Sequence, residues 1–357
     1  MTVSGVEFGK LSPLQMVQQW NLGIQQQILS GILFELNYVG SHALHLPIYV
    51  PFNLVPISEW DAVALANTTK TTQLAKPFPN IGTYSGVMDV GNASYNSLQA
   101  SLRRQFSSNL AFITNYTWAK NIDDDSSIFG NGLPAQASAH AQYSGNAALR
   151  RADRSPSSFD VRNTFNLALQ YTTGGPAWLR DIKISPIFIA HSGVALNITQ
   201  NNLIPNVTQQ RPNGDVSLLR LNKSYVGGTL VRYFKPPTDT TFPLTPTGPL
   251  FTGSGSSRQE VLSAALGDVG RNSVNAPGEM NLDLSLSRTF HVYREASFQL
   301  RVDAFNMLNH TNLGYPSLSL TATTSAAGVP IFNSSGFGAI SSAQPARVMQ
   351  LVSRFSF

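Results

Sequence analysis

Apolar and polar residues alternate regularly along much of the chain, and a period of two predicts β-strands with two unlike faces. In the last segment, one face carries Met349, Leu351, Phe355 and Phe357, and the other carries polar residues such as Arg354. The same period predicts nine strands, at residues 14–28, 32–39, 95–103, 110–119, 159–171, 181–198, 280–287, 298–304 and 345–357.

The connections between these strands alternate strictly between short and long. The short ones hold a few residues, and the long ones hold from about thirty to about eighty. Loops of that length are uncommon in compact soluble domains, but they are typical of transmembrane barrels, which have short periplasmic turns and long extracellular loops. Most of the predicted strands also reach the 9–11 residues that a tilted strand needs to cross a bilayer.

The long connections have no sustained period and are expected to be irregular. They cover residues 42–92, 121–158, 199–278 and 311–344 and are rich in Pro, Gly, Asn and Thr. Within them we predict only a short helix at residues 60–66 and a short β-segment at residues 230–234. In the strand at 181–198, Pro186 is expected at a bulge or at the rim, because proline cannot donate to a β-ladder.

Composition supports a membrane location. Charged residues make up 12 % of the chain, about half the usual share, and aromatic residues make up 10 %. The chain has no cysteine, which excludes disulfides and thiolate metal sites. No apolar run is long enough for a transmembrane helix. The net charge of +5 is scattered and forms no basic stripe, so we expect no nucleic-acid partner.

The two faces of the predicted strands have different expected roles. Apolar aromatic residues belong to the girdle at the membrane interface, and the candidates are Trp20, Tyr38, Tyr116, Trp118, Tyr171 and Phe357. Polar residues on the other face are expected to line a hydrated lumen, and the candidates are Glu35, Gln99, Arg103, Asn115, Asp283, Arg301 and Asp303.

The expected fold is an all-β, antiparallel up-and-down transmembrane β-barrel, present here as an incomplete C-terminal portion of about nine strands with long extracellular loops. Single-chain bacterial barrels have even strand counts, and nine is odd. The first residues also show no signal peptide, which an outer-membrane protein requires. We therefore expect residues 1–357 to be one partial barrel domain.

Several segments resemble the C-terminal barrel of Oar-like TonB-dependent receptors. They are Gln18–Gln25, Tyr95–Arg104, Asn115–Lys120, Gly270–Asn272, Asn281–Leu286, Arg301–His310 and Arg354–Phe357. Each is a weak pattern alone, but their order and spacing along most of the chain make the resemblance fairly specific.

This resemblance implies a barrel of about 22 strands closed by a plug. Such receptors of the Gram-negative outer membrane import a scarce small-molecule or oligomeric ligand with energy passed through TonB. The implied partners are outer-membrane lipid, TonB through a plug region, and the barrel-assembly machinery, which would recognise Phe355 and Phe357. No cofactor is implied.

Candidate chemistry is sparse. His42 and His45 lack a third metal ligand nearby, and the other histidines, His140, His191, His291 and His310, are scattered. The run Asp123–Asp125 could bind Ca²⁺ but lacks the spacing and glycine of an EF-hand, so a solvated loop is favoured. The basic cluster Arg150–Arg154 could meet lipopolysaccharide phosphates or, as we prefer, pair with Asp123–Asp125.

No catalytic constellation, glycine-rich phosphate loop or nucleophile elbow is present, so the sequence indicates no enzyme. The alternatives to a TonB-dependent receptor are a passive porin, a structural barrel and a soluble surface adhesin made of β-sandwich domains.

Overall fold

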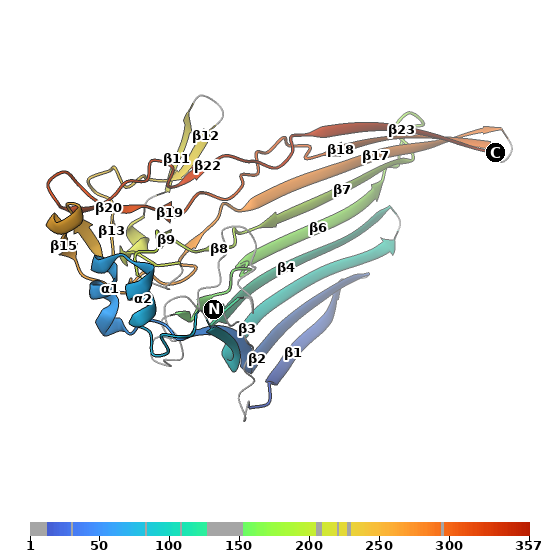
Figure 1. The fold of residues 1–357 in the computed structure, drawn as a ribbon. Helices are drawn as coiled ribbons and strands as arrows, with labels where there is room; N and C mark the ends of the chain where they lie inside the picture. Colours follow the sequence, from blue (N-terminus) through green and yellow to red (C-terminus); the bar gives the residue numbers. More distant parts are fainter. Residues whose placement is uncertain are drawn as a thin grey trace.

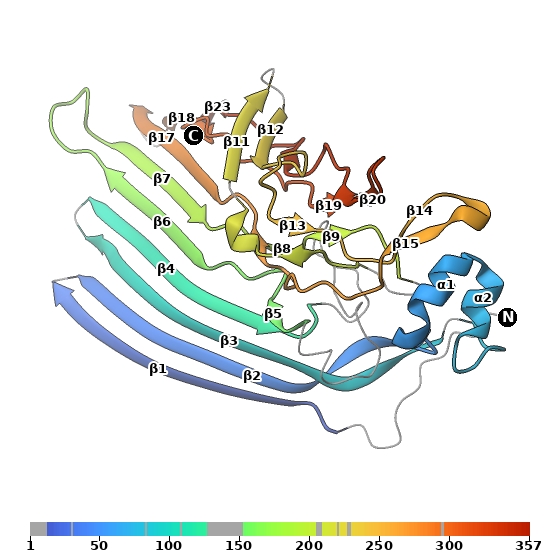
Figure 2. The same cartoon turned by 90° about the vertical axis from the view of Figure 1, so that its left-hand side faces the viewer.

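Nine long strands form one curved antiparallel sheet in the computed structural model, which describes residues 13–29, 31–82, 84–107, 109–126, 153–204, 209–219, 221–226, 230–293 and 296–357. The strands pair in the order in which they occur along the chain (Figures 1 and 2). They are β1 (Met16–Leu29), β2 (Ile32–Phe52), β3 (Tyr84–Ser107), β4 (Leu110–Asp123), β6 (Asn163–Thr172), β7 (Ile182–His191), β17 (Glu279–Tyr293), β18 (Ala296–Phe305) and β23 (Val348–Ser356).

The predicted fold class is therefore confirmed, and so is the count of nine for the long strands of the sheet. The sheet is curved like part of a barrel wall and is not closed, because β1 and β23 lie at its two edges (Figure 2). Each turn between paired neighbours at one end is short, and the long connections all lie at the other end (Figure 1). The short turn predicted at Arg294 and Glu295 lies outside the described residues.

The expectation that residues 42–92 form an irregular loop is wrong at both ends. β2 continues to Phe52, and β3 begins at Tyr84, so the two strands pair over a much longer ladder than the nine or so residues predicted. A bulge interrupts this ladder at His45, which has a positive φ of 57°. Since a bulge shifts the phase of side-chain alternation, it hides the continuing strand from a period-two search.

Pro186 lies inside β7 and not at a bulge or rim. The β7–β17 register runs without a shift from Ile182 to His191, with Pro186 opposite Leu284. On the other side of β7, the pairing with β6 has the same register throughout. Its pairs are missing only between Ala168 and Tyr171, which is the part of β6 opposite Pro186. The missing N–H of proline thus costs ladder hydrogen bonds on one side only.

The long connections at one end of the sheet fold into a packed region that we call the cap (Figure 1). It contains the helices α1 (Trp60–Ala66) and α2 (Thr69–Leu74) and the 3-10 turns η1 (Ile57–Glu59), η4 (Val216–Leu218) and η5 (Gly255–Ser257). The helix predicted at residues 60–66 is confirmed. No helix among the described residues is long and apolar enough to cross a membrane.

Short strands make up the rest of the cap in two- and three-stranded sheets, except that residues 155–156 pair with β4 of the long sheet, and the β-segment predicted at residues 230–234 is confirmed as β12. The short strands are β5 (Ser155–Pro156), β8 (Ala195–Leu196), β9 (Thr199–Gln200), β10 (Asn213–Gly214), β11 (Leu221–Val226), β12 (Leu230–Phe234), β13 (Leu244–Thr245), β14 (Leu250–Thr252), β15 (Gln259–Leu262), β16 (Val274–Asn275), β19 (Ser319–Leu320), β20 (Ala322–Thr324), β21 (Pro330–Phe332) and β22 (Ala339–Ile340).

The cap holds the main hydrophobic core of the described residues. Leu196, Ile198 and Phe337 have no exposed surface, and Phe242 packs edge-on against Phe337 with ring centroids 5.6 Å apart. A smaller core joins Trp60 and other residues of the first long connection to Ile204 of a later one. The described parts of the long connections are therefore structured and packed, contrary to the expectation of irregular loops.

Candidate functional site

One face of the sheet carries the polar residues that the sequence assigns to a lumen. Glu35 lies opposite Ser101, and the register across the next strands then aligns Asn115, Asn166, Ile189 and Asn281. Residues an even number of positions apart on a strand share a face. Gln99 and Arg103 are two residues from Ser101, and Asp283 is two residues from Asn281, so they lie on the face of this row. Arg301 and Asp303 pair with Ser287 and Ser285, which lie on the same face of β17. All the predicted lumen-facing residues thus share one face.

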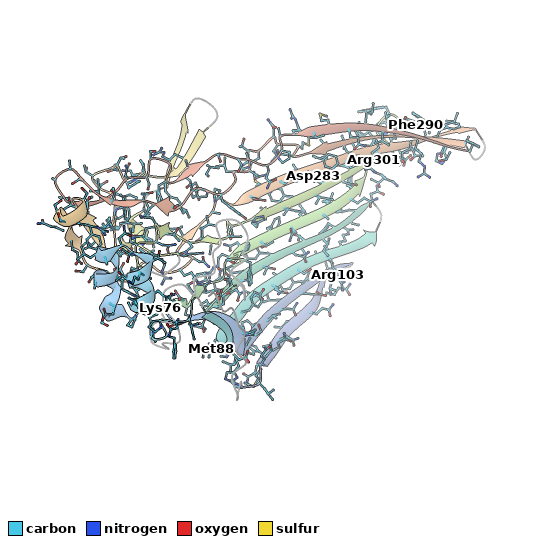
Figure 3. The ribbon with its side chains drawn as sticks, viewed as in Figure 1. Lys76, Met88, Arg103, Asp283, Phe290 and Arg301 are labelled. Atoms are coloured by element: carbon cyan, nitrogen blue, oxygen red, sulfur yellow. The ribbon has the colours of Figure 1, made fainter. Side chains whose placement is uncertain are left out.

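These polar residues form local groups and not one cluster. Glu35 accepts a hydrogen bond from Gln25 Nε2 at 2.8 Å and lies 3.4 Å from Arg103 Nη2. On β18, the Arg301 Nε atom donates to both carboxylate oxygens of Asp303, at 2.8 and 2.9 Å. Figure 3 shows Arg103 toward the β1 edge of the sheet and Arg301 toward the β23 edge, so the charged pairs are spread across the width of the wall.

Asp283 has a different environment, because it meets the turn that follows β18. Its Oδ1 atom accepts from Asn281 Nδ2 at 2.8 Å and from the Asn306 backbone N–H at 2.9 Å. Asn306 in turn binds the backbone of His310 through both ends of its side-chain amide. This carboxylate on the polar face thus fixes the start of the connection that leads into the last cap segment.

The opposite face of the sheet is apolar and carries the predicted girdle residues. Leu22, Tyr38, Leu98 and Trp118 align in one row across four strands, and Trp20 packs over Gly40, where a β-carbon would lie 2.3 Å from the indole ring. Many of these side chains are more than one-third exposed although they are large and apolar. A broad apolar surface of this kind is expected where a sheet faces lipid.

The aromatic residues of this face lie at two levels. Trp20, Tyr38, Tyr116 and Trp118 each lie at least six residues from the short turn of their strand, whereas Tyr171 lies beside the short turn that follows β6. The far level also contains an aromatic row across three strands, in which Phe290 pairs with Phe298 and Phe298 pairs with Phe355. Phe290 and Phe298 were not predicted as girdle residues from the sequence. Figure 3 shows Phe290 at the end of the sheet remote from Lys76 of the cap.

Where the cap meets the sheet, the structure buries a group of charged side chains. Arg271 is fully buried, and it contacts the Asp123 carboxylate, donates to the Asp123 carbonyl oxygen at 2.7 Å and donates to the Asp153 carbonyl oxygen at 2.9 Å. Arg211, also buried, lies 2.9 Å from the Asp153 carboxylate. These bonds join the end of β4 to three separate cap segments.

The predicted pairing of the aspartate run with the basic cluster is confirmed for one pair. Arg154 Nη1 lies 3.1 Å from the Asp124 carboxylate, while Arg150 and Arg151 lie outside the described residues. The favoured alternative of a solvated loop is wrong for Asp123 and Asp124, because both are buried. Arg211 and Arg271 were not predicted as partners, since they lie far from the aspartates in sequence and stand alone in loops.

The described residues hold no group of three or more His, Asp or Glu side chains with metal-binding geometry. His191 lies 3.4 Å from Glu279, and the ring of His45 contacts the Leu14 carbonyl oxygen. His140 lies outside the described residues. The carboxylate of Asp123, at the start of the proposed Ca²⁺ run, is instead bound by Arg271 and by the hydroxyl of Ser157.

Comparison with known families gives the same architecture. The sequence matches the family model described as outer membrane beta barrel domain over residues 2–350. The chain belongs to this family of outer-membrane barrels. Its long sheet is therefore a barrel wall located in the outer membrane, with its apolar face toward lipid. A search of curated proteins found no match.

Solved structures similar to this barrel chain include several outer-membrane receptors. They are the outer membrane transporter YddB from Escherichia coli (11% identity, 99% of this chain and 34% of that chain, TM-score 0.45), FpvA from P. aeruginosa bound to heterologous pyoverdines (11%, 97% and 28%, 0.41) and the ferric-catecholate import receptor Fiu from E. coli (11%, 99% and 30%, 0.40). The chain spans about a third of the length of these proteins.

Proposed function

We propose that this chain is part of the barrel of a TonB-dependent receptor, a ligand-gated active transporter that imports a scarce small-molecule or oligomeric ligand. One observation carries the proposal: a wall with an apolar lipid face and a polar, charge-paired face bears a cap with its own packed core. The sequence segments that resemble Oar-like receptors support it. Because the cap is well packed, it offers a fixed surface on which a ligand could be recognised.

The proposal includes a larger ring, of which residues 1–357 form one domain. Every residue of β1 is exposed, and β23 is exposed along most of its length, because each strand pairs on one side only. Unpaired backbone N–H and C=O groups are very costly in lipid. Both edges therefore require partner strands in the membrane, and a plug inside the ring would contact the polar face and TonB.

A passive porin and a surface adhesin are the competing functions. A porin needs an unobstructed aqueous path, and the cap of this chain occupies the end of the wall where such a path would open (Figure 1). An adhesin shares the exposed cap but needs neither charge pairs along the lumen face nor energy coupling. We assign no catalytic step to the chain.

The decisive experiment compares what cells remove from their medium. Wild-type cells, cells lacking this protein and cells lacking TonB are grown in the same medium, and its remaining compounds are measured by mass spectrometry. We expect the compounds left behind by cells without the protein to be left behind also by cells without TonB. Depletion that needs the protein but continues without TonB would establish a passive porin instead.

A second measurement tests the barrel without knowledge of the ligand. The protein is extracted from the outer membrane in detergent and added to planar lipid bilayers. We expect no steady ohmic conductance, because a gated receptor is closed at rest. Stable open channels would favour the porin, and recovery of the protein in the soluble fraction without detergent would favour the adhesin.

A further inference from the structure

A cavity of about 440 Å³ lies in the cap, where β9 and β19 pair in parallel. Both strands lie in the middle of the cap, away from the long sheet (Figure 2). A volume of this size falls within the range of small-molecule sites in proteins. Its walls come from two chain segments about 120 residues apart, one around Asn197–Asn202 and one around Pro316–Ser319.

The chemistry of the lining is neutral and rich in hydrogen-bonding groups. Five of the described lining residues carry carboxamides, and they are Asn197, Gln200, Asn201, Asn202 and Gln209. Most of the remainder carry hydroxyls, and no charged side chain is among the described residues that line the cavity. A charged ligand would lose hydration here without gaining a counter-charge, so the lining selects against ions.

Three of the five carboxamides hold the walls in place. Gln200 exchanges hydrogen bonds with Thr247, donating to its carbonyl oxygen at 2.8 Å and accepting from its N–H at 3.0 Å. Asn201 accepts from the Ala322 N–H at 2.8 Å, and Asn202 accepts from the Gln210 N–H. The hydrogen bonds of these three side chains therefore stabilise the walls of the cavity.

Asn197 is different, because its carbonyl group has no use in the fold. The side chain is 4 % exposed, and its Oδ1 atom has no hydrogen-bond partner among the described residues. Its Nδ2 atom makes only a long contact of 3.4 Å with Gln209 Oε1. A buried acceptor left without a donor is unfavourable, so an occupant that supplies one would be stabilised.

The backbone keeps Asn197 at the cavity and gives it little freedom to turn away. Its neighbours Leu196 and Ile198 are both fully buried in the cap core. Gln209, which also lines the cavity and contacts Asn197, has a positive φ of 55°, which is uncommon for a residue other than glycine. Strained backbone of this kind is often associated with functional sites.

We propose that this cavity binds a neutral polyhydroxylated ligand, namely a saccharide, with Asn197 and Gln209 as its principal hydrogen-bonding residues. A sugar hydroxyl both donates and accepts, as does a carboxamide, so adjacent hydroxyls can pair with the oxygen and nitrogen of one amide. The inference goes beyond the transport function, since it concerns binding to the cap and holds whether or not the bound saccharide is imported.

The test is saturation-transfer NMR on outer membranes from cells that make the protein, with membranes lacking it as the blank. The probes are glucose, N-acetylglucosamine and maltotriose, with glucuronate, glucosamine and a blocked neutral tripeptide for comparison. We expect a protein-dependent signal that is strongest for at least one of the neutral saccharides. Absence of any such signal, or stronger binding of a charged sugar or the peptide, overturns the proposal.

Variants locate the site. Asn197→Leu keeps the volume but removes both polar atoms, and we expect it to weaken saccharide binding about tenfold or more. The matched control is Asn333→Leu, which alters an exposed asparagine of the same cap and should leave binding unchanged. If Asn197→Leu does not accumulate in the membrane, Gln209→Glu replaces the amide donor beside Asn197 and should weaken binding similarly. Unchanged affinity in the variant tested places the ligand elsewhere and overturns the proposal.

Discussion

Arg271 illustrates how one charged side chain joins the cap to the barrel wall. Its guanidinium group binds the end of β4 through Asp123 and the segment before β6 through the Asp153 carbonyl oxygen. It also donates to Ser126 Oγ at 2.9 Å. The buried guanidinium group thus has hydrogen-bond acceptors at several of its nitrogen atoms. If it is removed, the buried carboxylate of Asp123 loses its cationic partner.

We expect Arg271→Met to weaken the attachment of the cap, because breaking a buried ion pair by removing one partner costs about 3–5 kcal/mol. The measurement is the rate at which an added protease cleaves the cap in outer membranes. Arg232→Met is the matched control, since Arg232 is more exposed and donates only to the Ser335 carbonyl oxygen among the described contacts.

The double variant Asp123→Asn/Arg271→Met separates the charge from the packing. It should recover part of the protease resistance, because the orphaned carboxylate is then neutral. Equal cleavage rates for the wild-type protein and Arg271→Met would contradict the assigned role of this arginine.

The tryptophans allow a direct test of the predicted girdle. The chain has four, and Trp20 and Trp118 lie on the apolar face while Trp60 is buried in the cap and donates to the Val55 carbonyl oxygen. In single-tryptophan variants reconstituted with brominated lipid, we expect strong fluorescence quenching of Trp20 and Trp118 and little of Trp60. Unquenched Trp20 would show that this level of the sheet does not meet lipid.

At the scale of elements, β23 combines two tasks. It pairs with β18 from Ser297 to Phe305, and its Phe355 continues the aromatic row formed by Phe290 and Phe298. Phe357 follows the strand and is almost fully exposed, with its ring 6.1 Å from that of Phe355. Neither ring is buried in a hydrophobic core, so both rings are accessible to another protein.

We predict that Phe357→Ala and Phe355→Ala lower the amount of protein assembled in the outer membrane several-fold, because the barrel-assembly machinery would lose its signal. Pulse-labelling followed by membrane fractionation measures this. Phe290→Ala, which removes a less exposed aromatic ring from the same level, should have a smaller effect. A similar loss in all three variants would attribute the effect to the girdle and not to the signal.

The elements also show what sequence alone can and cannot predict here. Period-two alternation located all nine sheet strands, because a wall between lipid and water must alternate. It missed the cap-side parts of β2 and β3, because the bulge at His45 shifts the phase of the alternation there. The buried charges were missed for another reason: Arg271 and Asp123 are 148 residues apart, and no local pattern links them.

At the scale of the whole molecule, the cap and the short turns lie at opposite ends of the wall (Figure 1). Outer-membrane barrels place long loops outside the cell and short turns in the periplasm. The cap is therefore expected on the cell surface, where a ligand first arrives, and the turn around Ala177 is expected in the periplasm.

The absence of cysteine makes this orientation easy to measure. Ser256→Cys, in the exposed part of the cap, should react with a membrane-impermeant maleimide on intact cells. Ala177→Cys, in the exposed turn between β6 and β7, should react only after the outer membrane is permeabilised. The reverse pattern of labelling would invert the proposed topology.

The pairing of nine consecutive antiparallel strands has a consequence for how the ring can close. An odd number means that β1 and β23 run in the same direction, from the cap toward the periplasmic end. Two copies joined edge to edge in one membrane would therefore meet at parallel seams. A fully antiparallel ring instead needs an odd number of additional strands, beginning and ending with strands that run outward. The roughly thirteen that remain in a barrel of about 22 strands satisfy this parity, whereas a second copy of this wall does not.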